Sequence, residues 1–513
     1  MPKLTIDGKT IEAPEGVNLI DAARLAGSKI PHYCYHRKLS VAGNCRICLV
    51  DIEKQPKLQI ACNTKAAEGM VVHTQSPKVL EGRQSVLEFI LVNHPIDCPI
   101  CDQAGECKLQ EYYMKHDLKP SRMTEEKVHK DKAVPLGPRV MLDMERCILC
   151  SRCIRFCQEI AHEDELCFTQ RGNHTELTSS PGKSLKNAYS VNTVDICPVG
   201  ALTSRDFRFK QRVWLLKETE SICPGCSTGC NVKIHDNKDV IYRLLPRTNE
   251  AVNECWMCDE GRDTYKPVND PARLRRSFIN RSGQREDLRR TKVLEELKKA
   301  LGSVAGNTIL GIGSAQFTVE DNYALMRFLK DTLGVQDFAY HAKEVSKPTS
   351  DNFLISADKN PNRAGVEALG FVPLDQLKQN LRKYRVFFLL GEADLTQLKD
   401  LSFDDRRLVV LFTAQDGPTA IEADFVLPVA LWAESDGTVV NRQRRIQRMH
   451  AAFPPPGEAL PVWGWVNEMA TAWGHSRLRY EAAEHVFADL AETFPTFKGI
   501  NYEKIGNGGL ILP

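Results

Sequence analysis

A run of closely spaced cysteines constrains the fold of this chain more than any other feature. The stretch from Cys147 to Cys157 reads Cys-Ile-Leu-Cys-Ser-Arg-Cys-Ile-Arg-Phe-Cys, and a remote Cys197 is followed by proline. Three thiolates in one loop, with the fourth ligand from elsewhere in the chain, are the ligand pattern of bacterial ferredoxins. Structural zinc sites usually take their ligands from two separated pairs. The stretch therefore predicts a 4Fe–4S cluster.

The other cysteines extend this prediction to the first half of the chain. All 18 cysteines lie between Cys34 and Cys258. The start of the sequence has no apolar signal core, and no run of about 18 apolar residues occurs, so we expect neither a signal peptide nor a transmembrane segment. Disulfides need an oxidising compartment, and clustered cysteines without an export signal indicate bound metal. We expect a metal-loaded front half and a metal-free back half.

Length and composition exclude few other classes. The 513 residues suffice for about three to five domains. Hydrophobic residues make up 42% and charged residues 26%, which is ordinary for a globular chain. The formal net charge is only +2, so nothing favours nucleic acid as a partner.

Residues 1–78 are expected to form a 2Fe–2S domain. An Asp-Gly turn between two alternating segments predicts a hairpin, and a helix should follow that ends at Gly27. The spacing of the four cysteines resembles a plant-type 2Fe–2S site, although the first gap is ten residues instead of four. A four-cysteine zinc site is the alternative. The candidate ligands are Cys34, Cys45, Cys48 and Cys62.

Residues 79–125 hold three thiols, one short of the number that a cubane needs. They are Cys98, Cys101 and Cys107, and the preceding segment has helical apolar spacing. His94 is the nearest candidate for the missing ligand. A neutral imidazole in place of a thiolate removes one negative charge and should raise the potential, as in Rieske centres.

Residues 126–212 contain the opening motif, with Cys147, Cys150, Cys153 and Cys197 as ligands. Arginines at 146, 152 and 155 interleave these thiols. Nearby cations would favour the reduced cluster. The alternative, which the sequence does not exclude for any single arginine, is an ordinary solvated charged face. Two further thiols are not needed for this site, and we expect them to be packing residues. They are Cys157 and Cys167.

Residues 213–272 carry a last group of thiols within a small predicted sheet. Cys223, Cys226 and Cys230 are followed at a distance by Cys255 and Cys258. We prefer Cys258 as the fourth ligand because it precedes Asp-Glu-Gly-Arg, but spacing alone leaves Cys255 open.

Residues 273–513 have a different texture. Short buried strands alternate with helical stretches, one of which opens at Thr318 with a capping-box pattern. This alternation predicts an α/β fold with a parallel sheet. Gly311 and Gly313 follow a strand, but the third glycine and the acidic partner of a dinucleotide site are missing.

These motifs together resemble a known family. The phrases that begin at Ile30 (Ile-Pro-His-Tyr-Cys-Tyr-His), at Cys45 (Cys-Arg-Ile-Cys-Leu-Val) and at Asn93 (Asn-His-Pro-Ile-Asp-Cys-Pro-Ile-Cys-Asp-Gln-Ala-Gly-Glu-Cys) are similar to those of the large iron–sulfur subunit of NADH:quinone oxidoreductase, respiratory complex I. The match covers residues 1 to about 270. The remainder resembles a molybdopterin oxidoreductase fold, at residues 422–428 and 434–438, but is shorter than in many members of the family.

The resemblance implies a fold class and ligand sets. The front half would be α+β, with a β-grasp 2Fe–2S ferredoxin domain, a helical one-His-three-Cys segment, a bacterial-ferredoxin-like domain and a small β-rich 4Fe–4S domain. A shortened α/β molybdopterin-oxidoreductase-like domain without an active-site cysteine would follow. The implied ligands are Cys34, Cys45, Cys48 and Cys62 for 2Fe–2S, and for three 4Fe–4S clusters His94, Cys98, Cys101 and Cys107; Cys147, Cys150, Cys153 and Cys197; and Cys223, Cys226, Cys230 and Cys258.

The function implied is electron transfer within a larger enzyme. Electrons would pass from a flavin/NADH-binding subunit toward quinone, through one 2Fe–2S and two or three 4Fe–4S clusters, with no molybdopterin and no catalytic side chain in this chain. The expected partners are the flavin subunit and the other iron–sulfur subunits of the peripheral arm. The expected location is the cytoplasmic face of the inner membrane, reached only through partner subunits.

Three other functions remain to be separated from this one. A molybdenum or tungsten enzyme, such as a formate dehydrogenase, would usually bind its metal through a cysteine or selenocysteine in the α/β part, and no cysteine follows Cys258. An NAD-linked hydrogenase electron-transfer subunit would usually stop before the α/β part. A zinc-bound scaffold would have neither colour nor an EPR signal.

Overall fold

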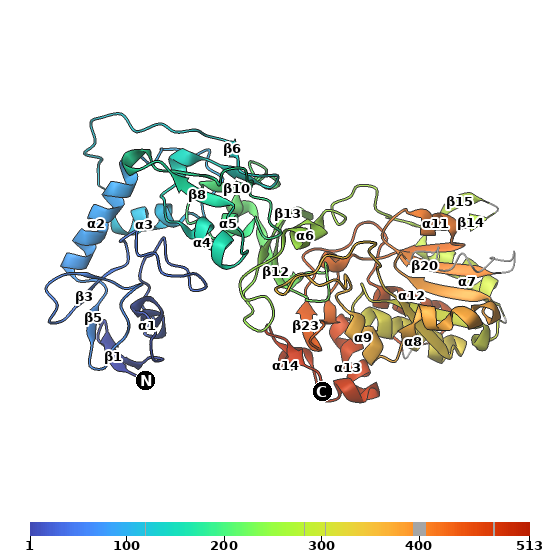
Figure 1. Cartoon of the computed structure of the whole chain (residues 1–513). Helices are drawn as coiled ribbons and strands as arrows, with labels where there is room; N and C mark the ends of the chain where they lie inside the picture. Colours follow the sequence, from blue (N-terminus) through green and yellow to red (C-terminus); the bar gives the residue numbers. More distant parts are fainter. Residues whose placement is uncertain (118, 282, 303, 393–406, 476–477) are drawn as a thin grey trace. The chain divides into compact units, whose positions relative to one another are not determined.

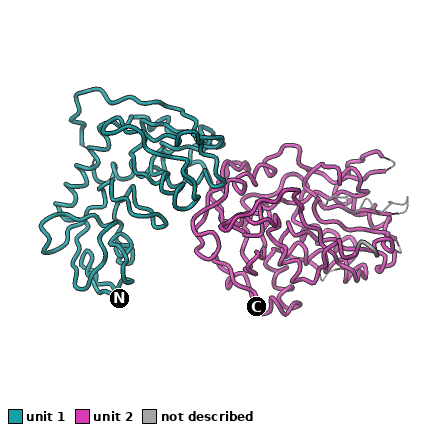
Figure 2. Tube along the Cα trace, viewed as in Figure 1, with its two compact units in different colours: residues 1–216 teal, residues 217–513 magenta. Residues whose placement is uncertain are grey.

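The computed structural model describes residues 1–513 except 118, 282, 303, 393–406 and 476–477. The chain divides into two compact units, residues 1–216 and residues 217–513 (Figure 2). The predicted domain boundaries within these units remain predictions.

The first unit begins with a mixed five-stranded sheet in the order β2-β1-β5-β3-β4. Strand β1 is antiparallel to β2 and parallel to β5. Asp7 and Gly8, both with positive φ, form the predicted hairpin turn, because an Asp-Gly pair tolerates the left-handed region. The elements are β1 (Lys3–Ile6), β2 (Lys9–Glu12), α1 (Leu19–Leu25), β3 (Leu49–Ile52), β4 (Gln59–Ile60) and β5 (Val71–His73).

Helix α1 illustrates how the sequence defines its own boundaries. The Asn18 side chain accepts hydrogen bonds from the N–H groups of Ile20 and Asp21, which caps the first turn. Gly27, with φ of 80°, follows the last turn, as the sequence predicted. The apolar face of α1 packs on the sheet in a core that includes two candidate ligands, Cys48 and Cys62.

The rest of the first unit consists of short elements that carry the cysteine loops. A three-stranded sheet has the order β10-β7-β6, and β8 pairs with β9. The elements are α2 (Pro77–Leu91), α3 (Lys108–His116), β6 (Val134–Pro135), β7 (Val140–Leu142), α4 (Arg152–Glu159), β8 (Leu166–Thr169), β9 (Glu176–Ser179), α5 (Asn192–Asp195) and β10 (Leu202–Ser204).

The second unit opens with the predicted small sheet. Its strands β11 (Lys217–Ile222), β12 (Asn231–Asn237) and β13 (Val240–Pro246) are antiparallel. Helix α6 (Asp259–Arg262) follows.

The larger part of the second unit is an α/β layer structure (Figure 1). Among the described residues its sheet has eight strands, in the order β15-β14-β21-β20-β19-β16-β17-β18. From β21 to β18 all neighbours are parallel, so the predicted parallel sheet is confirmed, while β14 and β15 form an antiparallel edge. The strands are β14 (Ser277–Arg281), β15 (Gln284–Leu288), β16 (Ile309–Ser314), β17 (Asp337–His341), β18 (Val372–Pro373), β19 (Val386–Leu390), β20 (Leu408–Thr413) and β21 (Phe425–Pro428).

Helices from several parts of the sequence cover this sheet and enclose its main core. The Thr318 hydroxyl accepts a hydrogen bond from the N–H of Asp321 at the start of α8, as predicted. The elements are α7 (Arg290–Leu301), α8 (Val319–Leu333), α9 (Arg363–Ala368), α11 (Pro418–Glu422), β22 (Gly437–Val440), β23 (Arg445–Met449), α12 (Val462–Trp473), α13 (Ala483–Thr493), α14 (Tyr502–Ile505) and β24 (Leu510–Ile511).

The two glycines of β16 are explained by packing. A Cβ at Gly311 would lie 2.7 Å from the Phe338 ring, and one at Gly313 would lie 2.4 Å from Oδ1 of Asn322. Only glycine fits at these close approaches. As for membranes, none of the helices in the described residues is both long enough and apolar enough to span one.

Candidate metal centres

The first candidate centre contains two close pairs of thiols. The backbone N–H of Cys34 lies 3.4 Å from Sγ of Cys45. The Cys45 thiol lowers the pKa of Cys34 to about 5, and the Cys48 thiol lowers the pKa of Cys62 in the same way. The two pairs also interact with each other, because the charge of Cys34 opposes ionisation of Cys62. Two pairs of thiols suit a two-iron centre with four cysteine ligands.

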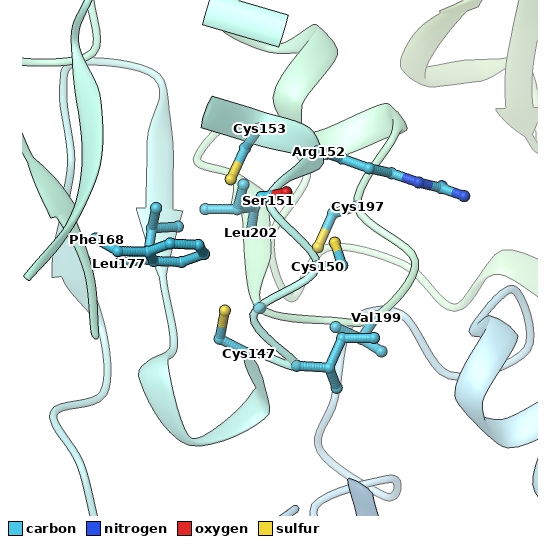
Figure 3. A pocket seen from close by; sticks show the side chains of 12 residues that line it. Cys147, Cys150, Ser151, Arg152, Cys153, Phe168, Leu177, Cys197, Val199 and Leu202 are labelled. Carbon is cyan, nitrogen blue, oxygen red and sulfur yellow. The ribbon is translucent and has the colours of Figure 1, made fainter. Parts of the chain in front are cut away.

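The second candidate centre, the ferredoxin-like site, surrounds a cavity with four cysteines. Figure 3 shows the thiols of Cys147, Cys150, Cys153 and Cys197 around the space between them. The rest of the lining is mainly apolar and includes Phe168, Leu177, Val199 and Leu202. A donor set of four thiols with apolar walls fits a cubane, which takes one thiolate per iron.

Burial controls the protonation of these thiols. It raises the pKa of Cys147 to about 12 and that of Cys150 to about 11. Without iron both thiols are therefore protonated at neutral pH. Metal ligation requires thiolates, so binding releases protons.

The backbone of the loops is shaped around these sites. Leu149 and Ser151, which lie within the motif, have φ of 53° and 60°, and Arg46 after Cys45 has φ of 59°. Residues other than glycine adopt this left-handed conformation at a free-energy cost, and such strained residues concentrate at functional sites. These strained residues are consistent with loops whose backbone is shaped to direct the cysteine thiols toward a common site.

The three arginines of the motif are buried. Arg146 is 4% exposed, and Arg152 and Arg155 are each 9% exposed. The alternative of an ordinary solvated charged face is therefore wrong. The sequence alone did not exclude it, because burial of these side chains depends on residues distant in sequence.

The third candidate centre brings together Cys98, Cys101 and Cys107. Burial raises the pKa of Cys107 to about 11, and the neighbouring thiols Cys101 and Cys98 add to the rise. Cys98 itself is exposed. The segment after Cys197 forms part of this centre, since a Cβ at Gly200 would lie 2.3 Å from Sγ of Cys101. Sequence reasoning missed Gly200, for which the Cys-Pro-Val-Gly context was the available signal.

His94 is partly buried. Burial lowers its pKa to about 4, and the charges of Arg146 and Lys127 act in the same direction. The imidazole is therefore neutral at pH 7, as a metal ligand must be. His94 lines a cavity of about 430 Å³ together with Cys45 and Cys147. Its participation in the third centre remains a prediction.

The fourth candidate centre lies in the second unit. Cys223, Cys226, Cys230 and Cys258 are all buried. Burial raises the pKa of Cys223, and the charges of Cys258 and Cys226 raise it further, so the side chains lie close together. Cys255 is partly exposed.

Backbone N–H groups point to the thiols of this centre. Gly225 donates to Sγ of Cys223 (3.4 Å), and Gly261 donates to Sγ of Cys258 (3.3 Å). A Cβ at Gly261 would lie 3.2 Å and 3.3 Å from these two sulfurs. Hydrogen bonds of this kind stabilise thiolates and tune iron–sulfur potentials. Sequence reasoning missed the role of Gly261, although it belongs to the Asp-Glu-Gly-Arg segment that favoured Cys258.

The remaining thiols are placed as packing residues. Cys157 is fully buried, and Sγ of Cys167 lies 3.6 Å from the Thr178 hydroxyl. In the part of the chain that the structure describes, no three or more His, Cys, Asp or Glu side chains are arranged to hold a single metal ion.

Five family models match the chain in the predicted order. They are a 2Fe-2S iron-sulfur cluster binding domain (residues 2–77), the NADH-ubiquinone oxidoreductase-G iron-sulfur binding region (83–122), the ferredoxin-like domain of NADH-quinone oxidoreductase subunit 3 (137–203), the molybdopterin oxidoreductase Fe4S4 domain (216–270) and molybdopterin oxidoreductase (282–472). The coarse domain order inferred from the sequence is confirmed.

Curated relatives and a solved structure are also similar. The NADH-quinone oxidoreductase G subunit of Rickettsia conorii is 40% identical over 72% of this chain and 54% of its own length. The mitochondrial NADH-ubiquinone oxidoreductase 78 kDa subunit of Neurospora crassa is 38% identical over 72% of this chain and 50% of its own. The chain thus spans about half the length of the curated relatives it matches. A crystal structure of an NAD+-reducing [NiFe]-hydrogenase is 28% identical, covers 41% of this chain and 91% of that chain, and has a TM-score of 0.38, which is too low to carry weight.

Proposed function

The chain is a homologue of the G subunit of NADH-quinone oxidoreductase, and from this relationship we propose that it relays electrons as an iron–sulfur subunit of such an enzyme. The observation that supports this most directly is the enclosure of one cavity by four cysteine thiols, those of Cys147, Cys150, Cys153 and Cys197. When bound, iron–sulfur clusters supply one-electron acceptance and release. The chain itself holds the ligands, excludes water and sets the local charge.

Each predicted domain has a proposed role. Residues 1–78 would be a β-grasp 2Fe–2S domain, 79–125 a one-His-three-Cys domain, 126–212 a ferredoxin-like domain, 213–272 a 4Fe–4S domain and 273–513 a molybdopterin-oxidoreductase-like domain. The proposed ligands are Cys34, Cys45, Cys48 and Cys62; His94, Cys98, Cys101 and Cys107; Cys147, Cys150, Cys153 and Cys197; and Cys223, Cys226, Cys230 and Cys258.

The proposed partners follow from the same relationship. A flavin subunit that oxidises NADH would deliver electrons, and other iron–sulfur subunits would carry them on toward quinone. The chain would meet the membrane, at its cytoplasmic face, only through these subunits. We propose no molybdopterin cofactor, because the back half contains no cysteine that could bind the metal.

A molybdenum or tungsten enzyme and a hydrogenase-linked subunit are the weaker alternatives. The relatives named as subunits of NADH-quinone oxidoreductase favour the first function over both. Stoichiometric molybdenum or tungsten in the purified protein would reverse this preference.

Iron and acid-labile sulfide per chain, with EPR after dithionite reduction, test the proposal. One two-iron and three four-iron centres correspond to about fourteen irons. A brown protein with one 2Fe–2S signal and several cubane signals is the expected result. Anaerobically purified protein that is colourless and free of iron would overturn the proposal.

A further inference from the structure

The buried arginines of the ferredoxin-like loop contact the loops of both neighbouring centres. We propose that Arg155 and Arg146 are positioning residues. Arg155 holds the loop of the first (2Fe–2S) centre against the ferredoxin-like centre, and Arg146 holds the loop of the third centre against the ferredoxin-like centre. Each arginine also raises the reduction potentials of the two centres that it joins. This inference rests on the proposed function.

Arg155 joins two ligand loops by direct hydrogen bonds. Its Nη2 donates to the main-chain carbonyl of Cys34 (2.6 Å) and to that of Cys150 (3.4 Å). Its Nη1 donates to the carbonyl of Ser40. One buried guanidinium therefore holds a ligand residue of the first centre and a ligand residue of the second.

The same face of α4 makes further contacts with these loops. Arg152 donates to the carbonyl of Tyr35, next to Cys34, and to that of Ile196 (2.9 Å), next to Cys197. Glu159 accepts a hydrogen bond from the backbone N–H of Ser40 (2.7 Å). Positions 152, 155 and 159 follow helical spacing, so one face of α4 holds the loop of residues 34–40.

Arg146 performs the corresponding role on the other side. It immediately precedes Cys147, and its guanidinium donates to Oδ2 of Asp97 from Nη2 (2.9 Å) and Nε (3.3 Å). The main-chain carbonyl of Asp97 accepts hydrogen bonds from Ile100 (2.9 Å) and Cys101 (2.7 Å), which shapes the loop from Cys98 to Cys101. The Arg146 side chain thus connects the backbone beside Cys147 to the loop of the third centre.

Charge gives these contacts a second consequence. Reduction adds an electron to a cluster that already has anionic ligands, so a nearby positive charge favours the reduced form. The effect is large because the guanidiniums are buried and poorly screened. Arg146 lies 2.9 Å from Asp97 and 3.2 Å from Asp143, and Lys132 also pairs with Asp97 (2.7 Å), so these carboxylates offset the positive charge around Arg146. Arg155, in contrast, donates its hydrogen bonds to neutral carbonyl and hydroxyl oxygens.

The test compares Arg155→Met with Arg146→Met in the full-length, iron-loaded chain. Iron and sulfide are measured first, and each midpoint is then determined by EPR-monitored redox titration. Variants in which one proposed cysteine ligand of a single centre is replaced identify which EPR signal belongs to that centre. Arg155→Met should lower the 2Fe–2S and ferredoxin-like midpoints and leave the third centre unchanged. Arg146→Met should lower the third and ferredoxin-like midpoints and leave the 2Fe–2S centre unchanged.

The expected shift is about a tenfold fall in the ratio of reduced to oxidised cluster at a fixed potential. Arg155→Lys retains the positive charge, so its midpoints should lie close to the wild-type values. Arg122→Met is the matched control, because this exposed arginine pairs with Glu88 in the same unit; it should change no midpoint.

Asp97→Asn separates an electrostatic role from loss of folding. It removes the carboxylate that Arg146 shares with Lys132, so the midpoint of the third centre should rise, the opposite of the Arg146→Met result. If wild-type protein holds its clusters but the variants shift no midpoint, or shift all of them equally, the inference fails while the proposed function stands. If wild-type protein holds no clusters, the proposed function itself fails.

Discussion

The backbone N–H of Lys108 donates a hydrogen bond to the main-chain carbonyl of Pro198, 3.0 Å away. Lys108 follows Cys107 and Pro198 follows Cys197, so candidate ligands of two different centres lie on either side of one peptide hydrogen bond. The same carbonyl lies 3.9 Å from Sγ of Cys107. The segment Cys197-Pro-Val-Gly therefore contacts both the ferredoxin-like centre and the third centre and separates one from the other.

Substitution of Gly200 in this segment should disturb the third centre. A Cβ there would lie 2.3 Å from Sγ of Cys101, and such overpacking typically costs about 1–3 kcal/mol. We expect Gly200→Ala to lose the third-centre EPR signal and about four irons per chain. Gly508→Ala is the control, because nothing lies within 4 Å of a Cβ at that position. Full iron content in Gly200→Ala would show that the sulfur can move away without loss of the cluster.

Exchange of His94 for cysteine should retain a cluster and lower its potential. A thiolate brings one more negative charge than a neutral imidazole, which disfavours reduction. EPR-monitored titration of His94→Cys measures the midpoint. His73→Cys is a control at a partly exposed histidine of the same unit. An unchanged midpoint in His94→Cys would count against His94 as a ligand.

The two late cysteines of the fourth centre should respond differently to substitution. Cys258 is buried among the other three thiols, whereas Cys255 is partly exposed. We expect Cys258→Ser to reduce the iron content by about four per chain and Cys255→Ser to leave it unchanged. The reverse result would assign the fourth ligand to Cys255.

A buried carboxyl should make the second unit less stable as the pH rises. Burial raises the pKa of Glu320 to about 7, although Tyr502 (2.7 Å) and Thr438 donate hydrogen bonds to it. The folded chain holds this proton more tightly than the unfolded chain, so the associated stability is present below about pH 4.5 and decreases up to about pH 7. The decrease is about 3 kcal/mol at most, from 1.36 kcal/mol per pKa unit.

Thermal unfolding at several pH values measures this effect. Glu320→Gln should reduce the decrease between about pH 4.5 and 7; a smaller decrease should remain from Asp321, whose pKa burial raises to about 6. Glu481→Gln, at an exposed position, should leave the profile unchanged. A Glu320→Gln variant with the wild-type pH profile would exclude Glu320 as the responsible group.

The sequence predicted local features well and distant contacts poorly. The Asp7-Gly8 turn, the start of α8 at Thr318 and the close spacing of Cys147, Cys150 and Cys153 all depend on neighbouring residues. The burial of Arg155 depends on Cys34 and Ser40, which lie more than 100 residues away in the sequence. Gly200 and Cys101, which lie close together in the fold, are separated by a similar length of sequence. Spacing within a motif carries no information about which loop will pack against it.

The peptide bond between Leu216 and Lys217 divides the molecule between its two compact units. Three candidate centres lie on one side of that bond and the fourth lies on the other. None of the four proposed ligand sets combines residues from both units. Recombination of genes at this point would therefore exchange the last proposed centre, with the α/β layers that follow it, and leave every other proposed ligand set intact.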